Sequence, residues 1–159
     1  MPRKGSVKTR RVAKDPIYNS RLVSKLINRV MKDGKKSIAR KHVYKAFELV
    51  EEKEKTDAMT VFRQALNNVK PNKEVRSRRV GGAAYQVPMP VRGARKNSLA
   101  IRWIITSARG RPNSEYHTYG EKLAAEILDA YNQTGGAYNK KQQVERAAEA
   151  NKAFSHLRW

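Results

Sequence analysis

Residues 75–91 read VRSRRVGGAAYQVPMPV, and this stretch decides how the chain folds. Its two halves, Val75–Val80 and Tyr85–Val91, flank the small residues 81–84, a layout typical of a β-hairpin. Pro88 and Pro90 lie two apart, so their missing N–H groups point to the same side, which suits a strand with a free edge. A two-stranded ribbon alone is marginal in water. We therefore predict an arm that projects from a larger body.

Apolar residues recur at helical spacing on both sides of this ribbon. Ser20 and Asp57 are expected helix caps, Thr118-x-x-Glu121 forms a capping box, and Gly135-Gly136 is expected to end a helix. The pattern predicts helices at about 20–34, 36–54, 57–71, 93–109, 118–135 and 139–155.

The predicted fold class is mainly α, a single-domain bundle of about six helices with a projecting two-stranded antiparallel β-ribbon. We expect a single domain over 1–159, with a basic arm at 1–16 and the ribbon at 74–91. The segment 139–159 has only a narrow apolar stripe, which predicts a loosely packed C-terminal helix and tail.

Basic side chains are concentrated in two blocks of a chain whose formal net charge is +21. Residues 1–41 hold fourteen basic and two acidic side chains, and residues 76–111 hold nine basic and no acidic ones, whereas the remaining segments are neutral. A folded surface normally mixes both signs, so such blocks are typical of a chain held against a polyanion. The bias toward arginine favours phosphate, whose oxygens the planar guanidinium binds in pairs.

Spacing arranges these charges on helix faces. Arg95, Arg102 and Arg109 are seven residues apart, so we expect them to share a face of the helix at 93–109. On the helix at 20–34, residues four apart form another basic row: Arg21, Lys25, Arg29 and, nearby, Lys32.

The residues for catalysis are missing from the sequence. His42, His117 and His156 are scattered, and the chain has no cysteine, which excludes disulfides, thiolate chemistry and cysteine-bound zinc. Gly34-Lys35-Lys36 resembles the end of a phosphate-binding loop, but Arg29 stands where that loop needs a glycine. We expect no enzyme, cofactor or metal, and no membrane partner, because no apolar run approaches the ~18 residues of a spanning helix.

The parts that nucleic-acid binding uses are present, with two interpretations open for each aromatic residue among the charges. Trp103 is expected in the core rather than on a base, and Tyr85 fits base stacking and ribbon packing equally. No helix-turn-helix or zinc module for reading duplex DNA is evident, so structured RNA fits better. The alternative is an architectural DNA-binding protein that inserts the arginine ribbon into a groove.

Long motifs also match a known family. The matching segments are Met1–Gly5, Asp15–Val23, Leu26–Lys36, Arg78–Pro88, Arg102-Trp103 and Ala148–Trp159. On these residues the chain closely resembles the bacterial or organellar small-subunit ribosomal protein seven family along nearly its whole length. His42 departs from the aliphatic residue usual there, and the stretch 110–120 looks longer than in typical members.

The resemblance implies a helical body with a projecting ribbon that binds the 3′ major domain of small-subunit rRNA and organises head assembly. It implies a place near the mRNA exit channel and exit-site tRNA, beside small-subunit ribosomal proteins nine, eleven and thirteen. The location would be the small ribosomal subunit of the cytoplasm, with an organellar matrix left open.

The resemblance also implies roles for particular residues. Those expected to bind rRNA are Arg3, Lys4, Lys8, Arg10, Arg11, Lys35, Lys36, Arg76, Arg78, Arg79, Arg92, Arg95, Arg102 and Arg109. Those expected to face exit-site tRNA are Gly81, Gly82, Ala83, Ala84, Tyr85, Lys152 and Arg158. No residue is expected to be catalytic or to bind a metal.

Overall fold

A computed structural model describes residue 5 and residues 11–158 of the chain. Its helices are α1 (Arg21–Val30), α2 (Lys36–Glu54), α3 (Ala58–Val69), α4 (Ala94–Gly110), α5 (Tyr119–Tyr131), α6 (Gly135–Ala150) and the 3₁₀ helix η1 (Lys152–Leu157). The strands are β1 (Lys73–Val80) and β2 (Ala83–Pro90), an antiparallel pair. Within the described residues, the prediction of about six α-helices with a two-stranded ribbon is therefore confirmed.

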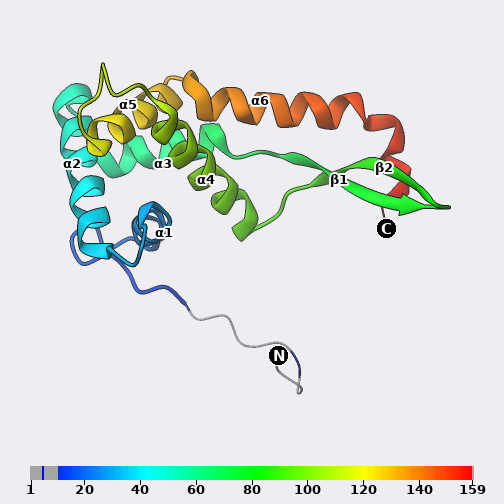
Figure 1. The fold of residues 1–159 in the computed structure, drawn as a ribbon, viewed down its shortest axis with the longest axis horizontal. Helices are drawn as coiled ribbons and strands as arrows, with labels where there is room; N and C mark the ends of the chain where they lie inside the picture. The colour runs from blue at the N-terminus through cyan, green and yellow to red at the C-terminus, as the bar shows by residue number, and fades with distance from the viewer. Residues whose placement is uncertain (1–4, 6–10, 159) are drawn as a thin grey trace.

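The helices α1–α5 form a body at one end of the molecule, and the ribbon extends away from it beside α6 (Figure 1). The helix α5 lies at the centre of this body, because it packs against α2, α3, α4 and α6 and buries nine of its thirteen residues. Large side chains from several helices fill the core around it, among them Phe47, Phe62, Leu66, Ile104 and Ile127. This packing supplies a rigid base for the ribbon.

Two of the predicted caps are confirmed and one is not. The Asp57 carboxylate accepts hydrogen bonds from the N–H groups of Met59 and Thr60 at the start of α3. Thr118 and Glu121 form the reciprocal capping box at the start of α5. Ser20 stands at the N-cap position of α1, but its side chain makes no capping hydrogen bond. Residue type therefore located all three helix starts, although only two use the expected side-chain bond.

The ribbon turns over two residues rather than four. Val80 pairs with Ala83 and Arg79 with Ala84, so the two alanines belong to β2 and only Gly81 and Gly82 form the turn. These glycines have φ values of 56° and 90°. A two-residue hairpin turn of the type that matches strand twist needs positive φ at both central positions, which glycine adopts without steric cost.

Two predicted helix ends were wrong. The helix α1 ends at Val30, four residues before Gly34, and the chain then turns with Asp33 and Gly34 in the left-handed region. Gly135 and Gly136 begin α6 instead of ending α5, which stops at Tyr131. The reason is a buried acid on α5: the Glu126 carboxylate accepts the N–H of Ala137 at 2.8 Å, which satisfies a free donor in the first turn of α6.

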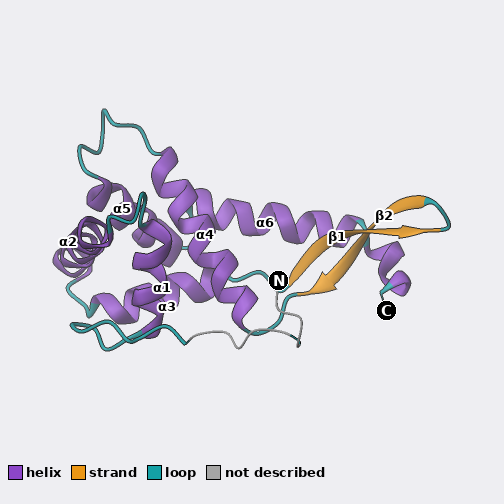
Figure 2. Ribbon diagram, turned by 60° about the horizontal axis from the view of Figure 1, so that its bottom comes forward, coloured by secondary structure: helices purple, strands orange, loops and turns teal. Residues whose placement is uncertain are grey.

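The ribbon is braced along α6 rather than isolated, as the side-by-side path of the strands and α6 in Figure 2 shows. Glu145 of α6 accepts the backbone N–H of Asn72 at 2.9 Å, and Lys73 pairs with Glu149 at 3.1 Å. Farther out, the rings of Tyr85 and Phe154 lie 5.4 Å apart. The helix itself buries only Ala137 and Ala148, and its predicted loose packing stays a prediction.

Candidate nucleic-acid interface

The ribbon presents arginines on both of its faces. Side chains alternate along a strand, so Arg76 and Arg78 share one face and Arg79 lies on the other. Arg76 and Arg79 are exposed, and Arg78 is half-buried. The Nε group of Arg79 donates to the backbone oxygen of Gly82 at 3.3 Å, which holds this side chain toward the turn.

Glu74 joins the ribbon to α4 through two of the predicted site residues. Its side chain is 10% exposed and accepts hydrogen bonds from Arg76 at 2.6 Å and from Arg95 at 2.7–2.9 Å. Burial alone would raise the pKa of Glu74, but the bonds from Arg95 and Arg76 outweigh burial and hold this pKa below its usual value. The two arginine side chains remain about half exposed, at 50% and 52%. We call this group the Glu74 clamp.

The clamp fixes two guanidinium groups from different elements beside one another. A guanidinium has five N–H donors, and the carboxylate of Glu74 leaves several of them on each arginine for other acceptors. Fixing a long side chain in advance lowers the entropy lost when it binds an anion. The residue pattern gave Glu74 no role, because its contact with Arg95 spans 21 residues.

The predicted arginine row of α4 has three different environments. Arg95 belongs to the Glu74 clamp, and Arg102 is exposed. Arg109 is exposed as well, but its Nη2 donates to the backbone oxygen of Val30 at 3.0 Å. That oxygen lies at the C-terminal end of α1, where a cation also interacts favourably with the helix dipole. Arg109 therefore bridges two helices while it faces solvent.

A second basic surface forms where α1 packs against α4. Lys25 and Arg29 of α1 line a hollow of about 370 Å³ together with Ala94, Ser98 and Ile101 of α4. Lys25 and Arg29 were not among the predicted site residues, although their spacing of four had already placed them on one helix face. Ser98 and Arg102 are four residues apart on α4, so this row lies next to the face that carries Arg102.

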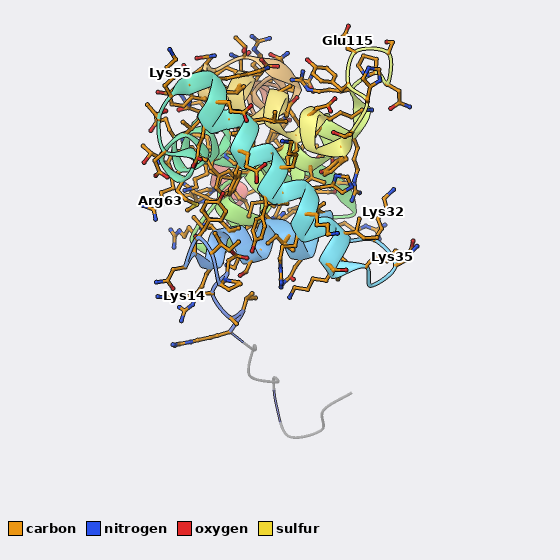
Figure 3. All side chains as sticks on the ribbon, turned by 90° about the vertical axis from the view of Figure 1, so that its left-hand side faces the viewer. Lys14, Lys32, Lys35, Lys55, Arg63 and Glu115 are labelled. Carbon is orange, nitrogen blue, oxygen red and sulfur yellow. The ribbon has the colours of Figure 1, made fainter. Side chains whose placement is uncertain are left out.

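The other predicted cations that the structure describes are also on the surface of the protein. Lys35, Lys36, Arg92 and Arg11 are all exposed. Lys35 precedes α2 and lies near Lys32 at one corner of the molecule (Figure 3). The predicted arm residues Arg3, Lys4, Lys8 and Arg10 fall outside the described residues.

The residues expected to face tRNA gather at the outer end of the ribbon. The strand β2 contacts η1, so residues 81–85 lie at the same end of the molecule as Lys152 and Arg158. Both of these cations are exposed, and Lys152 pairs with Glu149 at 3.2 Å. Tyr85 is half-buried against Phe154, which favours ribbon packing over base stacking. Trp103 is half-buried against the core, as expected.

Arg111 belongs to the interior and not to the interface. Its side chain is 17% exposed and donates to Glu126 at 2.8 and 2.9 Å, to Asp129, and to the hydroxyl of Tyr116 at 3.2 Å. Burial opposes its charge, but the bonds to Asp129 and Glu126 outweigh burial, so the pKa of Arg111 is raised. Of the nine cations in residues 76–111, Arg111 is therefore the one that a pair of internal acids neutralises.

Among the described residues, no group of His, Asp and Glu side chains is arranged to hold a metal ion. None of the helices in this part of the chain is long and apolar enough to cross a membrane. The positive features are a helical body, a braced arginine ribbon and a second basic surface between α1 and α4. These features are typical of the class of proteins that bind polyanions.

Sequence comparison identifies the family within that class. The family described as Ribosomal protein S7p/S5e matches residues 2–152. The chain is 57% identical to small ribosomal subunit protein uS7 of Acetivibrio thermocellus and 58% identical to that of Thermoanaerobacter sp., in both cases over the full length of both chains. The uS7 protein of Dictyoglomus turgidum is 56% identical over the same extent. The chain therefore belongs to the ribosomal protein S7p/S5e family, whose members are structural and not enzymatic.

Proposed function

We propose that this protein is a structural constituent of the small ribosomal subunit that binds the 3′ major domain of the rRNA and nucleates assembly of the head. What supports the proposal is the family, together with the pairing of two basic surfaces on one rigid body. The observation that carries it is the Glu74 clamp, which fixes Arg76 of the ribbon and Arg95 of α4 at a single point. Two fixed surfaces at a set angle suit a folded RNA junction, which proteins recognise by shape and phosphate position.

The finer parts of the proposal concern neighbours. The outer end of the ribbon, with Lys152 and Arg158, would face exit-site tRNA, and the protein would lie near the mRNA exit channel. Small-subunit ribosomal proteins nine, eleven and thirteen would be adjacent in the assembled head, and the compartment would be the cytoplasm. The exposed cations at the ribbon end support this assignment. The short turn of two glycines supports it as well, because it lets the backbone approach a nucleic acid closely.

A competition experiment separates this function from architectural DNA binding. Labelled RNA from the head domain is bound to the protein and challenged with equal concentrations of structured RNA or of duplex DNA of the same length. We expect only the structured RNA to compete well, because two basic surfaces held at a fixed angle match an irregular RNA fold better than a regular duplex. Equal competition by duplex DNA would favour the architectural alternative.

Replacing Glu74 tests the clamp by the sign of its effect. Glu74→Ala raises the net charge by one, so a simple electrostatic view predicts tighter RNA binding. We expect weaker binding instead, by about tenfold, because Arg76 and Arg95 would lose their fixed positions and bind with a larger entropy cost. Filter binding to the head-domain RNA at constant salt gives the measurement.

Glu52→Ala is the matched control, since it removes one exposed acid from the surface of α2. We expect this variant to bind as tightly as the wild type or slightly more tightly. Glu74→Gln, which keeps an acceptor but loses the charge, should fall between the two. Tighter binding by Glu74→Ala, with an unchanged melting temperature, would show that the clamp does not position its arginines for RNA.

A further inference from the structure

A small pocket lies at the corner where four helices of the body meet. It has a volume of about 280 Å³ and is formed by the end of α1, the turn into α2, the start of α2, the end of α4 and the start of α5. The apolar part of its lining comes from Val30, Ile38 and Ala39. The pocket shares helices α1 and α4 with the α1–α4 surface, but none of its lining residues belongs to that surface or to the Glu74 clamp.

One side chain of this pocket is more exposed than its chemistry favours. Ile38 is 51% exposed, and within the described residues the only other large hydrophobic side chain counted as exposed is Ile17. A single exposed isoleucine is ordinary on a protein surface. Ile38, however, stands at the mouth of a pocket whose other apolar residues, Val30 and Ala39, are only 7% and 5% exposed. The apolar surface is therefore continuous from the mouth inward.

One polar group of the pocket lacks a hydrogen-bond acceptor. The hydroxyl oxygen of Tyr119 is buried with no partner at hydrogen-bonding distance, and the side chain of Arg109, which interacts with it, can only donate. The Tyr119 O–H is therefore an unused donor, whereas most buried polar atoms in proteins have a partner. Burial raises the pKa of Tyr119 to about 12, against a smaller opposite effect of Arg109, so the hydroxyl keeps its proton at neutral pH. The ring of His42 meets that of Tyr119 edge to face at 5.9 Å. The rings of His42 and Tyr119 thus form an aromatic wall of the pocket, and the Tyr119 hydroxyl is a donor that an occupant could use.

The charged side chains that line the pocket are all basic. Lys32, Lys35 and Arg109 line it, and its lining residues within the described chain include no acid. Figure 3 shows Lys32 and Lys35 near one another at this corner of the molecule. Arg109 is held there by its bond to the oxygen of Val30, which uses one of its five N–H donors. The occupant should therefore combine a flat or apolar group with negative charge.

We propose that the pocket receives one unpaired base of the bound RNA, whose flanking phosphates lie on Lys32, Lys35 and Arg109. This inference rests on the proposed rRNA binding and adds a base-specific contact to it. An unpaired base has a flat apolar face that can pack on Ile38 and on the rings of His42 and Tyr119. Its polar edge can accept a hydrogen bond from the Tyr119 hydroxyl. An apolar side chain of a neighbouring protein would pack on Ile38 but would give the three cations no negative charge and the Tyr119 hydroxyl no acceptor.

Matched substitutions at the two exposed isoleucines test the pocket. Ile38→Glu places a negative charge at its mouth, and Ile17→Glu makes the same change outside it. We expect Ile38→Glu to weaken binding of the head-domain RNA by roughly 5- to 150-fold more than Ile17→Glu, the range that one stacked base supplies. Tyr119→Phe, which removes only the hydroxyl, should weaken it by a smaller factor.

Photo-crosslinking identifies the occupant. With p-benzoylphenylalanine in place of Ile38, irradiation of reconstituted subunits should attach the protein to a single unpaired nucleotide. Removing that base from the RNA should then abolish the difference between wild type and Ile38→Glu. Crosslinks to a protein, or equal RNA binding by the two glutamate variants, would overturn the pocket proposal alone. Failure of the wild type to bind the RNA would instead refute the proposed function.

Discussion

Binding of the head-domain rRNA fragment should weaken roughly 10³–10⁵-fold between 50 and 200 mM monovalent salt, if about 6–10 phosphates are neutralised. The reason is counterion release: each lysine or arginine that replaces a condensed cation adds to the slope of log affinity against log salt. The structure offers enough cations for this number, because at least seven of them are exposed: Lys25, Arg29, Lys35, Lys36, Arg79, Arg92 and Arg102. A filter-binding titration gives the slope, and a flat curve would refute an electrostatic mode of binding.

Two variants of the ribbon separate the contribution of its arginines to this salt slope from that of its turn. Replacing Arg76, Arg78 and Arg79 together with alanine should make the slope shallower by about three, one for each lost phosphate contact. Shortening the chain by residues 81–84 removes no cation, so the slope should stay unchanged. We expect this deletion to leave head assembly mostly intact and to disturb exit-site tRNA or reading-frame maintenance. Equal assembly defects in both variants would contradict this division between the ribbon and its turn.

Local chemistry explains which features could be predicted from the sequence. The capping box of Thr118, the cap of Asp57 and the paired glycines at 81 and 82 each act within a few residues, so their patterns are visible in the chain. The helical body and the ribbon follow from the periods of the apolar residues. The charge blocks and the bias toward arginine led to the RNA-binding interpretation, and the family motifs added the ribosomal role.

Contacts between distant residues explain what the sequence could not show. Spacing placed Arg95 and Arg109 on one helix face, and the resemblance implied the same role for both. In the structure Arg95 pairs with Glu74, 21 residues away, whereas Arg109 bonds to the backbone of Val30, 79 residues away. A glycine pair can end one helix or begin the next, and only the buried Glu126 carboxylate beneath Ala137 decides between these outcomes. Such choices depend on tertiary packing, which residue spacing does not encode.

Arg111→Ala should cost about 3–5 kcal/mol of the free energy of unfolding, because removing one partner of a buried ion pair leaves the other charge uncompensated. The partner is Glu126, whose side chain is 2% exposed and also accepts the first-turn N–H of α6. The variant would therefore loosen the junction of α5 and α6 as well as the loop at Tyr116. Urea denaturation followed by circular dichroism measures the loss.

Arg63→Ala is the control for Arg111→Ala, since Arg63 is exposed on α3 and its loss should change stability by less than about 0.5 kcal/mol. Adding Glu126→Gln to Arg111→Ala should recover part of the loss, because glutamine keeps an acceptor for Ala137 without the buried charge. Under conditions where it is folded, Arg111→Ala should keep the wild-type salt slope for RNA, unlike the ribbon variants. A shallower slope would place Arg111 on the RNA and show that its acidic partners do not occupy it in the bound state.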